Sequence, residues 1–175
     1  MRIAIVLDPL PSIKTYKDST YAMMREAHVR SHSLYWLPRE NLAWKNDKVL
    51  AQVYPLRLQE GPGWYLLGEG FETTLGIFDA VLMRKDPPFD IEYIFSTYLL
   101  ELAENESALV VNRPRSVRDF NEKLAIARYP QFTPPTLVTC HESAIRDFLR
   151  EHEDLLGSPF SWRLSFSRRL VRLIW

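Results

Sequence analysis

The sequence predicts an α/β fold built around a parallel sheet. Short apolar runs rich in β-branched residues are followed by polar turns and by segments with helical spacing. The opening residues read as strand, helix and strand, which is the repeating unit of parallel sheets. A chain of 175 residues has room for one domain of ordinary size and part of another.

Three segments predict the β-α-β opening. Residues 3–7 are a continuous apolar run that Asp8 ends, which is typical of a strand buried on both faces. Asp18 or Ser19 can cap the helix that follows, because their side-chain oxygens accept hydrogen bonds from backbone N–H groups. Residues 34–37 predict the second strand.

The middle of the chain mixes two kinds of strand. Residues 49–58 and 64–67 alternate like antiparallel strands, and the glycines and proline at 61–63 predict the turn between them. Residues 80–83 and 108–111 are short apolar runs again. They predict two further buried strands of the parallel sheet.

A helix is predicted over residues 91–104, with Asp90 as its N-cap. Apolar side chains recur there at intervals of three and four residues, namely Ile91, Ile94, Phe95, Tyr98 and Leu102. An overlapping set at similar spacing is interpreted as core packing, namely Tyr93, Phe95, Tyr98 and Leu99. We therefore expect the four side chains of this second set to lie in the core.

A domain boundary is predicted near residue 120. Residues 1–120 hold the elements of one complete α/β domain, whereas residues 121–156 begin a further structure with a predicted helix over 142–152. Residues 157–175 form a compositional break, because they contain arginines and no acidic residue. Such a basic, apolar tail is either a contact surface or an aggregation risk.

The charge balance and the cysteine content limit the kinds of molecule that the chain is expected to bind and the compartment in which it is expected to work. The 22 basic and 22 acidic residues balance, which argues against a nucleic acid or an anionic membrane as partner. The single cysteine, Cys140, excludes an internal disulfide and a metal site with several thiolate ligands. Such sparse use of cysteine fits a protein of a reducing compartment. The apolar run at the amino terminus is too short for a signal peptide or a membrane span, so we expect a cytoplasmic protein.

Polar side chains follow the predicted parallel strands. The three sets are Asp8 with Lys17, Asp18 and Ser19; Arg84 with Lys85, Asp86 and Asp90; and Asn112 with Arg113 and Arg115. We expect them to converge at one edge of the sheet, where open α/β folds bind ligands. Guanidinium groups hold carboxylate or phosphate and carboxylates hold ammonium, which favours a small zwitterionic ligand such as an amino acid or peptide. The alternative stays open, because polar loops follow strands in any α/β protein.

Other candidate sites are weak. The glycines between residues 61 and 76 form neither of the strand-to-helix loops that cradle phosphates. The four histidines lack the spacing of metal ligands. Cys140 and His141 are adjacent, so in an extended segment they point to opposite faces and do not suggest an activated thiol. No catalytic residue and no metal ligand is assigned.

Five segments in order resemble the prokaryotic glutathione synthetase family of ATP-grasp ligases. They are L-D-P from residue 7, K-D-S-T-Y-A-M from 17, M-R-K-D-P-P-F-D from 83, V-N-R-P from 111 with R-D-F-N-E-K-L from 118, and T-P-P-T-L-V-T from 133. The M-R-K-D-P-P-F-D string is highly specific. The resemblance covers residues 1–156.

The resemblance implies a fold, a reaction and roles for three residues. Residues 1–120 would be a Rossmann-like pre-ATP-grasp domain and residues 121–156 the start of an ATP-grasp domain. The family joins γ-glutamylcysteine to glycine with ATP and Mg²⁺ (or Mn²⁺), through an acyl-phosphate, and implies a homo-oligomer. Lys123 would contact an ATP phosphate, Arg84 would line the peptide-substrate side, and Ser19 would present backbone N–H groups to an anion of the substrate.

The chain departs from the family after residue 156. Ser158 stands where the family has a second phosphate-binding lysine, and the glycine-rich loop over ATP is missing. We therefore expect the chain to be inactive by itself, and a frameshifted or prematurely ended reading frame is one hypothesis for the tail. The alternatives are a non-catalytic interaction module or pseudoenzyme fragment that keeps the family's oligomer contacts, and a poorly stable pseudogene product.

Overall fold

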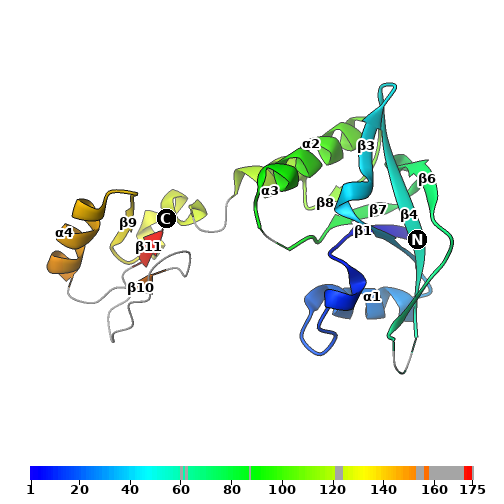
Figure 1. Cartoon of the computed structure of the whole chain (residues 1–175), viewed down its shortest axis with the longest axis horizontal. Helices are drawn as coiled ribbons and strands as arrows, with labels where there is room; N and C mark the ends of the chain where they lie inside the picture. Colours follow the sequence, from blue (N-terminus) through cyan, green and yellow to red (C-terminus); the bar gives the residue numbers. More distant parts are fainter. Residues whose placement is uncertain are drawn as a thin grey trace. The chain divides into compact units, whose positions relative to one another are not determined.

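The computed structural model describes residues 1–59, 61, 63–86, 88–120, 124–152, 156–157 and 172–174. The chain divides into two compact units, Met1–Asp119 and Phe120–Trp175 (Figure 1). The first unit is a mixed α/β structure with a mostly parallel central sheet, so the predicted fold class is confirmed.

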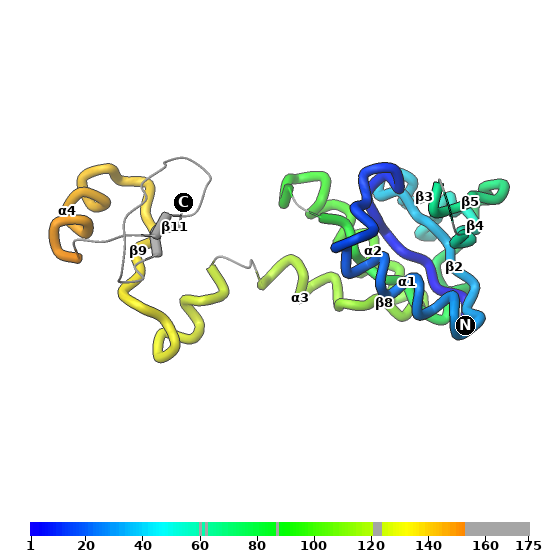
Figure 2. Tube along the Cα trace, turned by 90° about the horizontal axis from the view of Figure 1, so that it is seen from below, coloured from blue at the N-terminus to red at the C-terminus, as the bar shows by residue number. Residues whose placement is uncertain are grey.

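The first unit is built on a parallel core of four strands within the described residues. These are β1 (Arg2–Val6), β2 (Ser33–Leu37), β7 (Ala80–Met83) and β8 (Val110–Val111), in the order β2-β1-β7-β8. Figures 1 and 2 both draw β1 in the middle of this unit. The four predicted parallel strands are therefore confirmed.

An antiparallel part extends the sheet beyond β2. The long strand β4 (Lys48–Leu58) pairs with β2 and with three shorter strands, β3 (Leu42–Lys45), β5 (Tyr65–Leu67) and β6 (Phe71–Thr74). The predicted pair β4 and β5 is confirmed.

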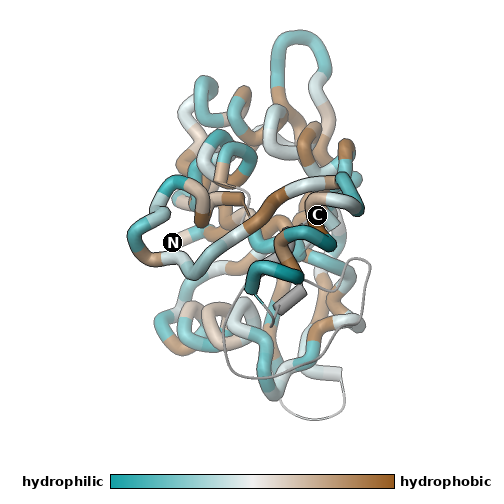
Figure 3. The backbone as a smooth tube through the Cα atoms, turned by 90° about the vertical axis from the view of Figure 1, so that its left-hand side faces the viewer, coloured by the Kyte–Doolittle hydropathy of each residue, from teal (hydrophilic) through white to brown (hydrophobic). Residues whose placement is uncertain are grey.

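Strands β3 and β6 were not expected from the sequence. Asn46 and Asp47, with φ of 51° and 59°, form the tight turn between β3 and β4. Two consecutive residues of positive φ fit the right-handed twist of a hairpin. In Figure 3 the tip of this hairpin is teal, because only polar residues occupy it.

Helices cover both faces of the sheet. Alternate residues of β1 point to opposite faces, so Ala4 and Val6 join one buried cluster whereas Ile5 joins the other. Helix α1 (Ser19–Val29) contributes Met24 to the cluster around Ile5. Helix α2 (Ile91–Asn105) contributes Leu100 to the cluster around Val6. Figure 1 draws α1 below the sheet and α2 above it.

Both predicted helix caps are present. The Asp18 side chain accepts a hydrogen bond from the backbone N–H of Tyr21 at 2.9 Å. The Asp90 side chain accepts one from the backbone N–H of Tyr93 at 2.7 Å. Each cap satisfies one of the N–H groups that have no partner inside the helix.

The predicted core packing on α2 is wrong for Phe95 and Tyr98, which are exposed. The exposed fractions are 59% for Ile91, 57% for Phe95, 47% for Tyr98 and 41% for Leu102. The buried face holds Tyr93, Ser96, Thr97, Leu100 and Ala103. Ser96 and Thr97 can be buried because their hydroxyls donate to helix carbonyls, of Tyr93 at 2.6 Å and of Ile94 at 2.7 Å. Tyr93 and the half-buried Leu99 do pack against the core as expected.

The first unit ends with α3 (Pro114–Asp119), which packs against α2. Short 3₁₀ turns at Leu10–Ser12, Arg39–Asn41 and Leu75–Ile77 connect its elements. The second unit contains α4 (Glu142–His152), where a helix was predicted. Its strands β9 (Thr136–Val138), β10 (Leu156–Gly157) and β11 (Arg172–Ile174) pair in parallel, after 3₁₀ turns at Ala125–Arg128 and Pro130–Phe132. Most of the tail predicted over 157–175 lies outside the described residues.

Candidate functional site

The candidate site lies where β1 and β7 end and α1 begins. Val6 pairs with Met83 in parallel register, and the backbone N–H of Arg84 donates to the Val6 carbonyl at 2.9 Å. The loops after the two strands therefore start side by side. This is the crevice in which open α/β sheets bind ligands.

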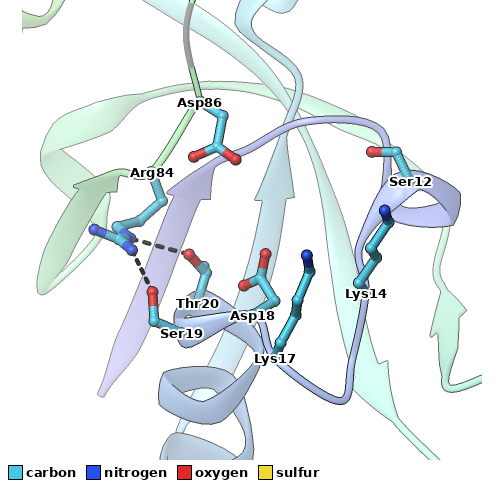
Figure 4. A pocket seen from close by; sticks show the side chains of 8 residues that line it. All are labelled: Ser12, Lys14, Lys17, Asp18, Ser19, Thr20, Arg84 and Asp86. Carbon is cyan, nitrogen blue, oxygen red and sulfur yellow. Dashed lines mark hydrogen bonds between the residues drawn. The ribbon is translucent and has the colours of Figure 1, made fainter. Parts of the chain in front are cut away.

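A hollow of about 410 Å³ opens between these loops. It is lined by Ser12, Lys14, Lys17, Asp18, Ser19, Thr20, Arg84 and Asp86 (Figure 4). The lining residues come from the loop after β1, the first turn of α1 and the loop after β7. Two of the three predicted sets of polar residues thus meet here.

Arg84 and Ser19 are in direct contact. The Arg84 guanidinium donates from Nη2 to Ser19 Oγ at 2.9 Å and from Nε to Thr20 Oγ1 at 3.0 Å (Figure 4). Thr20 is 3% exposed, so this end of the guanidinium is anchored in the protein. Hydroxyl oxygens carry no formal charge, and the positive charge of Arg84 is therefore not neutralised by these contacts.

Three cations at the hollow lack a carboxylate partner among the described residues. Lys14, Lys17 and Arg84 form none of the ion pairs found there; the Lys17 ammonium lies 5.9 Å from the centre of the Tyr16 ring. In Figure 4 the side chains of Lys14 and Lys17 both point upward, with the Lys14 ammonium beneath Ser12 and the Lys17 ammonium beside Asp18. Such unpaired cations attract a ligand with negative charge.

The two carboxylates at the hollow differ in whether they already accept a hydrogen bond. Asp18 is used as the cap of α1. The Asp86 carboxylate has neither a hydrogen bond nor an ion pair within the described part of the chain, so it can accept hydrogen bonds from a ligand. The hollow therefore offers an excess of positive charge together with one free carboxylate.

A partly buried ion pair holds the loop after β7 in place. Asp8 Oδ1 lies 2.6 Å from Lys85 Nζ, and Asp8 Oδ2 accepts a hydrogen bond from the backbone N–H of Asp86 at 2.9 Å. The Lys85 side chain is 15% exposed and that of Asp8 is 25% exposed. Both carboxylate oxygens of Asp8 thus fix the segment that carries Arg84 and Asp86.

Tyr93 connects the site to the core of the unit. Burial raises the pKa of Tyr93, and the negative charge of Asp86 raises it further, whereas the positive charge of Arg84 lowers it. The phenol itself belongs to the buried cluster around Val6.

The third predicted set does not line the hollow. Asn112, Arg113 and Arg115 are absent from its lining. The chain turns into α3 directly after β8, and Arg115 pairs along that helix with Asp119 at 3.4 Å. Asp90, from the second set, caps α2 and pairs with Arg39 at 3.2 Å. Strands β7 and β8 run in parallel register and so end at the same edge of the sheet, but these residues lie outside the hollow.

Ser12, Lys14 and Thr20 were missed by the sequence interpretation. Lys14 lies three residues before Lys17 in the same polar loop, and this position could have marked it as a candidate site residue. Ser12 and Thr20 gave no such signal, because single hydroxyls are common in loops and first helical turns.

Some assignments have no counterpart in the described structure. Lys123, the predicted ATP contact, lies outside the described residues. Among the residues that are described, no group of three His, Cys, Asp or Glu side chains could hold a metal ion. In the same part of the chain, no helix is both long and apolar enough to cross a bilayer.

Comparison with known proteins identifies the family. A family model described as the N-terminal domain of prokaryotic glutathione synthetase matches residues 1–118. The chain belongs to the prokaryotic glutathione synthetase family. The resemblance inferred from the five sequence segments is thereby confirmed.

Relatives in this family are named glutathione synthetase. The protein of Nitrosomonas europaea is 58% identical over 163 residues, which cover 91% of this chain and 51% of the relative. The proteins of Pseudomonas putida and Ralstonia nicotianae are 45% and 46% identical over 160 residues, covering 91% of this chain and 50% and 49% of the relatives. The chain spans about half the length of the curated relatives it matches.

Proposed function

We propose that this chain supplies the dipeptide-binding end of a glutathione synthetase, which ligates γ-glutamylcysteine to glycine with ATP. The observation that carries the proposal is the hollow at the ends of β1 and β7, whose three cations and one carboxylate lack ionic partners among the described residues. γ-Glutamylcysteine carries two carboxylates and one ammonium group at neutral pH. Its charges therefore complement those of the hollow.

Each charged group of the hollow suits one part of the dipeptide. Arg84, anchored on Ser19 and Thr20, has further N–H groups that can bind a carboxylate in a fixed plane. Lys14 and Lys17 are flexible point charges for the remaining negative charge, and Asp86 suits the ammonium group. The volume of about 410 Å³ lies in the range of small-molecule sites.

We assign the nucleotide to a different part of the chain from the dipeptide. ATP would supply the phosphoryl group that activates a carboxylate of the dipeptide for attack by the glycine amine. We assign Lys123 to the ATP phosphates and residues 121–156 to the start of an ATP-grasp domain, both on family resemblance. The described residues offer no metal cluster, so no step is assigned to Mg²⁺ on them.

Calorimetric titration of the full chain with γ-glutamylcysteine tests the dipeptide site. Arg84→Ala is expected to weaken binding by at least ~10-fold, because it removes a charge-assisted contact. Arg25→Ala removes the same kind of side chain from an exposed position of α1 outside the hollow and is the matched control. Absence of binding by the wild-type chain, or equal losses in both variants, would refute the proposed site.

A second titration tests the role of Asp86. Glutaryl-cysteine lacks the ammonium group of γ-glutamylcysteine but keeps both carboxylates. Asp86→Asn is expected to weaken binding of γ-glutamylcysteine and to leave binding of glutaryl-cysteine unchanged or stronger. Equal effects on the two ligands would contradict an ammonium contact at Asp86.

Ligation is tested separately from binding. An assay coupled to ADP release, with γ-glutamylcysteine and glycine, measures turnover by the full chain. Turnover would contradict the expectation that this chain is inactive by itself, whereas binding without turnover would support a role limited to the dipeptide.

A second candidate function is a non-catalytic interaction module. The exposed apolar side chains of α2 favour it, because large apolar groups on a surface commonly mark contact sites. Co-purification with a full-length glutathione synthetase would support this candidate, and a chain that shows no partner would count against it.

A further inference from the structure

Thr20 places a hydroxyl group on the buried face of α1. Its side chain is 3% exposed, and Met24, one turn later on the same face, is fully buried. A buried hydroxyl costs free energy unless it has a hydrogen-bond partner, whereas valine fills nearly the same volume without that cost. Among the described residues the Thr20 hydroxyl has such a partner in the side chain of Arg84. Contact with Arg84 therefore accounts for a threonine at this position.

Thr20 and Ser19 together occupy one edge of the Arg84 guanidinium, here called the side edge. Nε donates to Thr20 Oγ1 at 3.0 Å, and Nη2 donates to Ser19 Oγ at 2.9 Å. Figure 4 shows both bonds leading to the first turn of α1. A single hydrogen bond would leave the guanidinium free to rotate about it. Two bonds from one edge of a planar group fix the plane of that group.

A second edge of the same guanidinium is left without a partner. The group carries five N–H bonds in one plane, and the two hydroxyls accept from two of them. Nη1 has no partner within the described part of the chain. The remaining N–H groups of Nη1 and Nη2 form the terminal edge, whose parallel donors match the two oxygens of a carboxylate. The hydroxyls of Thr20 and Ser19 therefore set the plane in which this edge can bind a ligand.

The backbone holds both ends of this contact in place. The backbone N–H of Arg84 donates to the Val6 carbonyl at 2.9 Å, which ties Arg84 to the end of β1. Asp18 caps α1 by accepting a hydrogen bond from the backbone N–H of Tyr21 at 2.9 Å, which fixes the turn that carries Thr20. Groups on strands and helices are held more precisely than groups on loops. The orientation of Arg84 is thus determined by the sheet on one side and by a capped helix on the other.

We propose that Thr20 is a positioning residue for Arg84. Its buried hydroxyl, together with Ser19, holds the side edge of the guanidinium, so that the terminal edge binds one carboxylate of the ligand. That carboxylate belongs to γ-glutamylcysteine, so this role rests on the proposed function. One free edge holds one carboxylate, which leaves the second carboxylate of the dipeptide to Lys14 and Lys17.

Calorimetric titration of full-chain variants with γ-glutamylcysteine tests the positioning. Thr20→Val removes the hydroxyl at nearly constant volume and is expected to weaken binding at least ~5-fold, because the guanidinium loses one of its two anchors. Thr20→Ser keeps the hydroxyl and should bind within about 2-fold of wild type. Thr97→Val is the matched control and should leave the affinity unchanged. Thr97 is also buried and accepts a hydrogen bond from an arginine, Arg118 at 3.3 Å, but lies outside the hollow.

Arg84→Lys separates the orientation of the guanidinium from its charge. Lysine keeps the positive charge but has no planar edge, so binding is expected to weaken at least ~5-fold, and Thr20→Val should cause no further loss in this background. Circular dichroism checks that each variant is folded, and Thr20→Ala removes the same hydroxyl should Thr20→Val fail to fold. Wild-type affinity in the folded Thr20 variant without a hydroxyl would overturn the proposal. So would an equal loss in Thr97→Val, or a Thr20→Ser chain that binds no better than Thr20→Val.

A measurement without ligand distinguishes this inference from the proposed function. In a proton–nitrogen NMR correlation spectrum, the Nε–H resonance of Arg84 is assigned by its absence in Arg84→Lys. The hydrogen bond to Thr20 should slow exchange of this proton with water, so the resonance should persist in wild type and Thr20→Ser and be lost in Thr20→Val. That pattern in a chain that does not bind γ-glutamylcysteine would refute the proposed function and support the positioning of Arg84 by Thr20. A resonance that Thr20→Val leaves unchanged would overturn the role of Thr20.

Discussion

Arg84 is held by neutral partners, and this determines what it can bind. Its guanidinium donates to the hydroxyls of Ser19 and Thr20, whereas an aspartate in their place would neutralise it. Asp8 has the complementary role, because it neutralises Lys85 and orders the backbone at Asp86. The ion pair with Asp8 thus neutralises the charge of Lys85. The two hydroxyls leave the charge of Arg84 available for a ligand.

Asp8→Asn should weaken the loop after β7 and the dipeptide site together. The change leaves the largely buried Lys85 without a carboxylate partner, which we expect to cost about 1–3 kcal/mol of unfolding free energy. Urea denaturation measures this loss, and titration with γ-glutamylcysteine should show weaker binding. Glu72→Gln, at an exposed position of β6, is the control. Unchanged stability and unchanged affinity would contradict a positioning role for Asp8.

The cap residue Asp90 predicts a pH dependence. The hydrogen bond from the backbone of Tyr93, together with Arg39, holds the pKa of Asp90 below its usual value near 3.8. The ionised form is favoured in the folded chain, so its stabilisation is complete above pH 3.8 and is lost as the pH falls through the folded pKa. Asp90→Ala should lower the melting temperature by a few degrees at neutral pH, and the difference should shrink in acid.

Asp90→Asn separates the two contributions of this residue. Asparagine keeps a cap oxygen but does not titrate, so most of the neutral-pH stability should remain while the acid-dependent part disappears. Melting curves of the three proteins between neutral and acidic pH measure both. A difference between wild type and Asp90→Ala that is the same at every pH would be inconsistent with this explanation.

At the scale of elements, α2 has two apolar faces with different roles. Leu100 is fully buried against the sheet, whereas Leu102, on the opposite face of the helix, is 41% exposed. Ser96 and Thr97 lie on the buried face because their hydroxyls bond to helix carbonyls. The more hydrophobic face is therefore not the face that packs on the sheet.

Two leucine substitutions distinguish these faces. Leu100→Ala should lower the unfolding free energy by about 2–5 kcal/mol, because it leaves a cavity in the core. Leu102→Ala should change the unfolding free energy by less than about 1 kcal/mol, because this side chain is 41% exposed. Urea denaturation of both variants measures the contrast. Equal losses would mean that Leu102 is also packed within one chain.

At the scale of the whole molecule, the family match and the compact first unit end almost together. The family model ends at residue 118, and the first unit ends at Asp119. Both buried clusters lie entirely within this unit. A unit with its own core on both faces of a sheet has what it needs to fold independently.

A fragment of residues 1–119 should therefore fold by itself. We expect one cooperative urea transition, near-ultraviolet circular dichroism of packed aromatic residues, and retained binding of γ-glutamylcysteine. The full chain, measured in parallel, is the reference. A gradual transition without cooperativity would show that residues beyond 119 are needed for the first unit to fold.

The sequence by itself determined the order of the four parallel strands and of α1 and α2, the cap of α2, two candidates for the cap of α1, and the family. These follow from local patterns: apolar runs, turn residues, and a cap within three residues of its N–H partner. It also pointed to Ser19 and Arg84, which their positions after strand ends and the family motifs single out. The short strands β3 and β6 escaped prediction because four-residue strands carry too few alternations to be recognised.

Only the tertiary structure decided which face of α2 is buried and which polar groups meet. The contacts of Arg84 with Thr20 and Ser19 join residues 64 and 65 positions apart, and that of Asp8 with Asp86 joins residues 78 apart. No local pattern encodes such pairs. They arise because parallel strands bring the ends of distant segments to one edge of the sheet, and because a hydroxyl bonded within its own helix can be buried as readily as an apolar group.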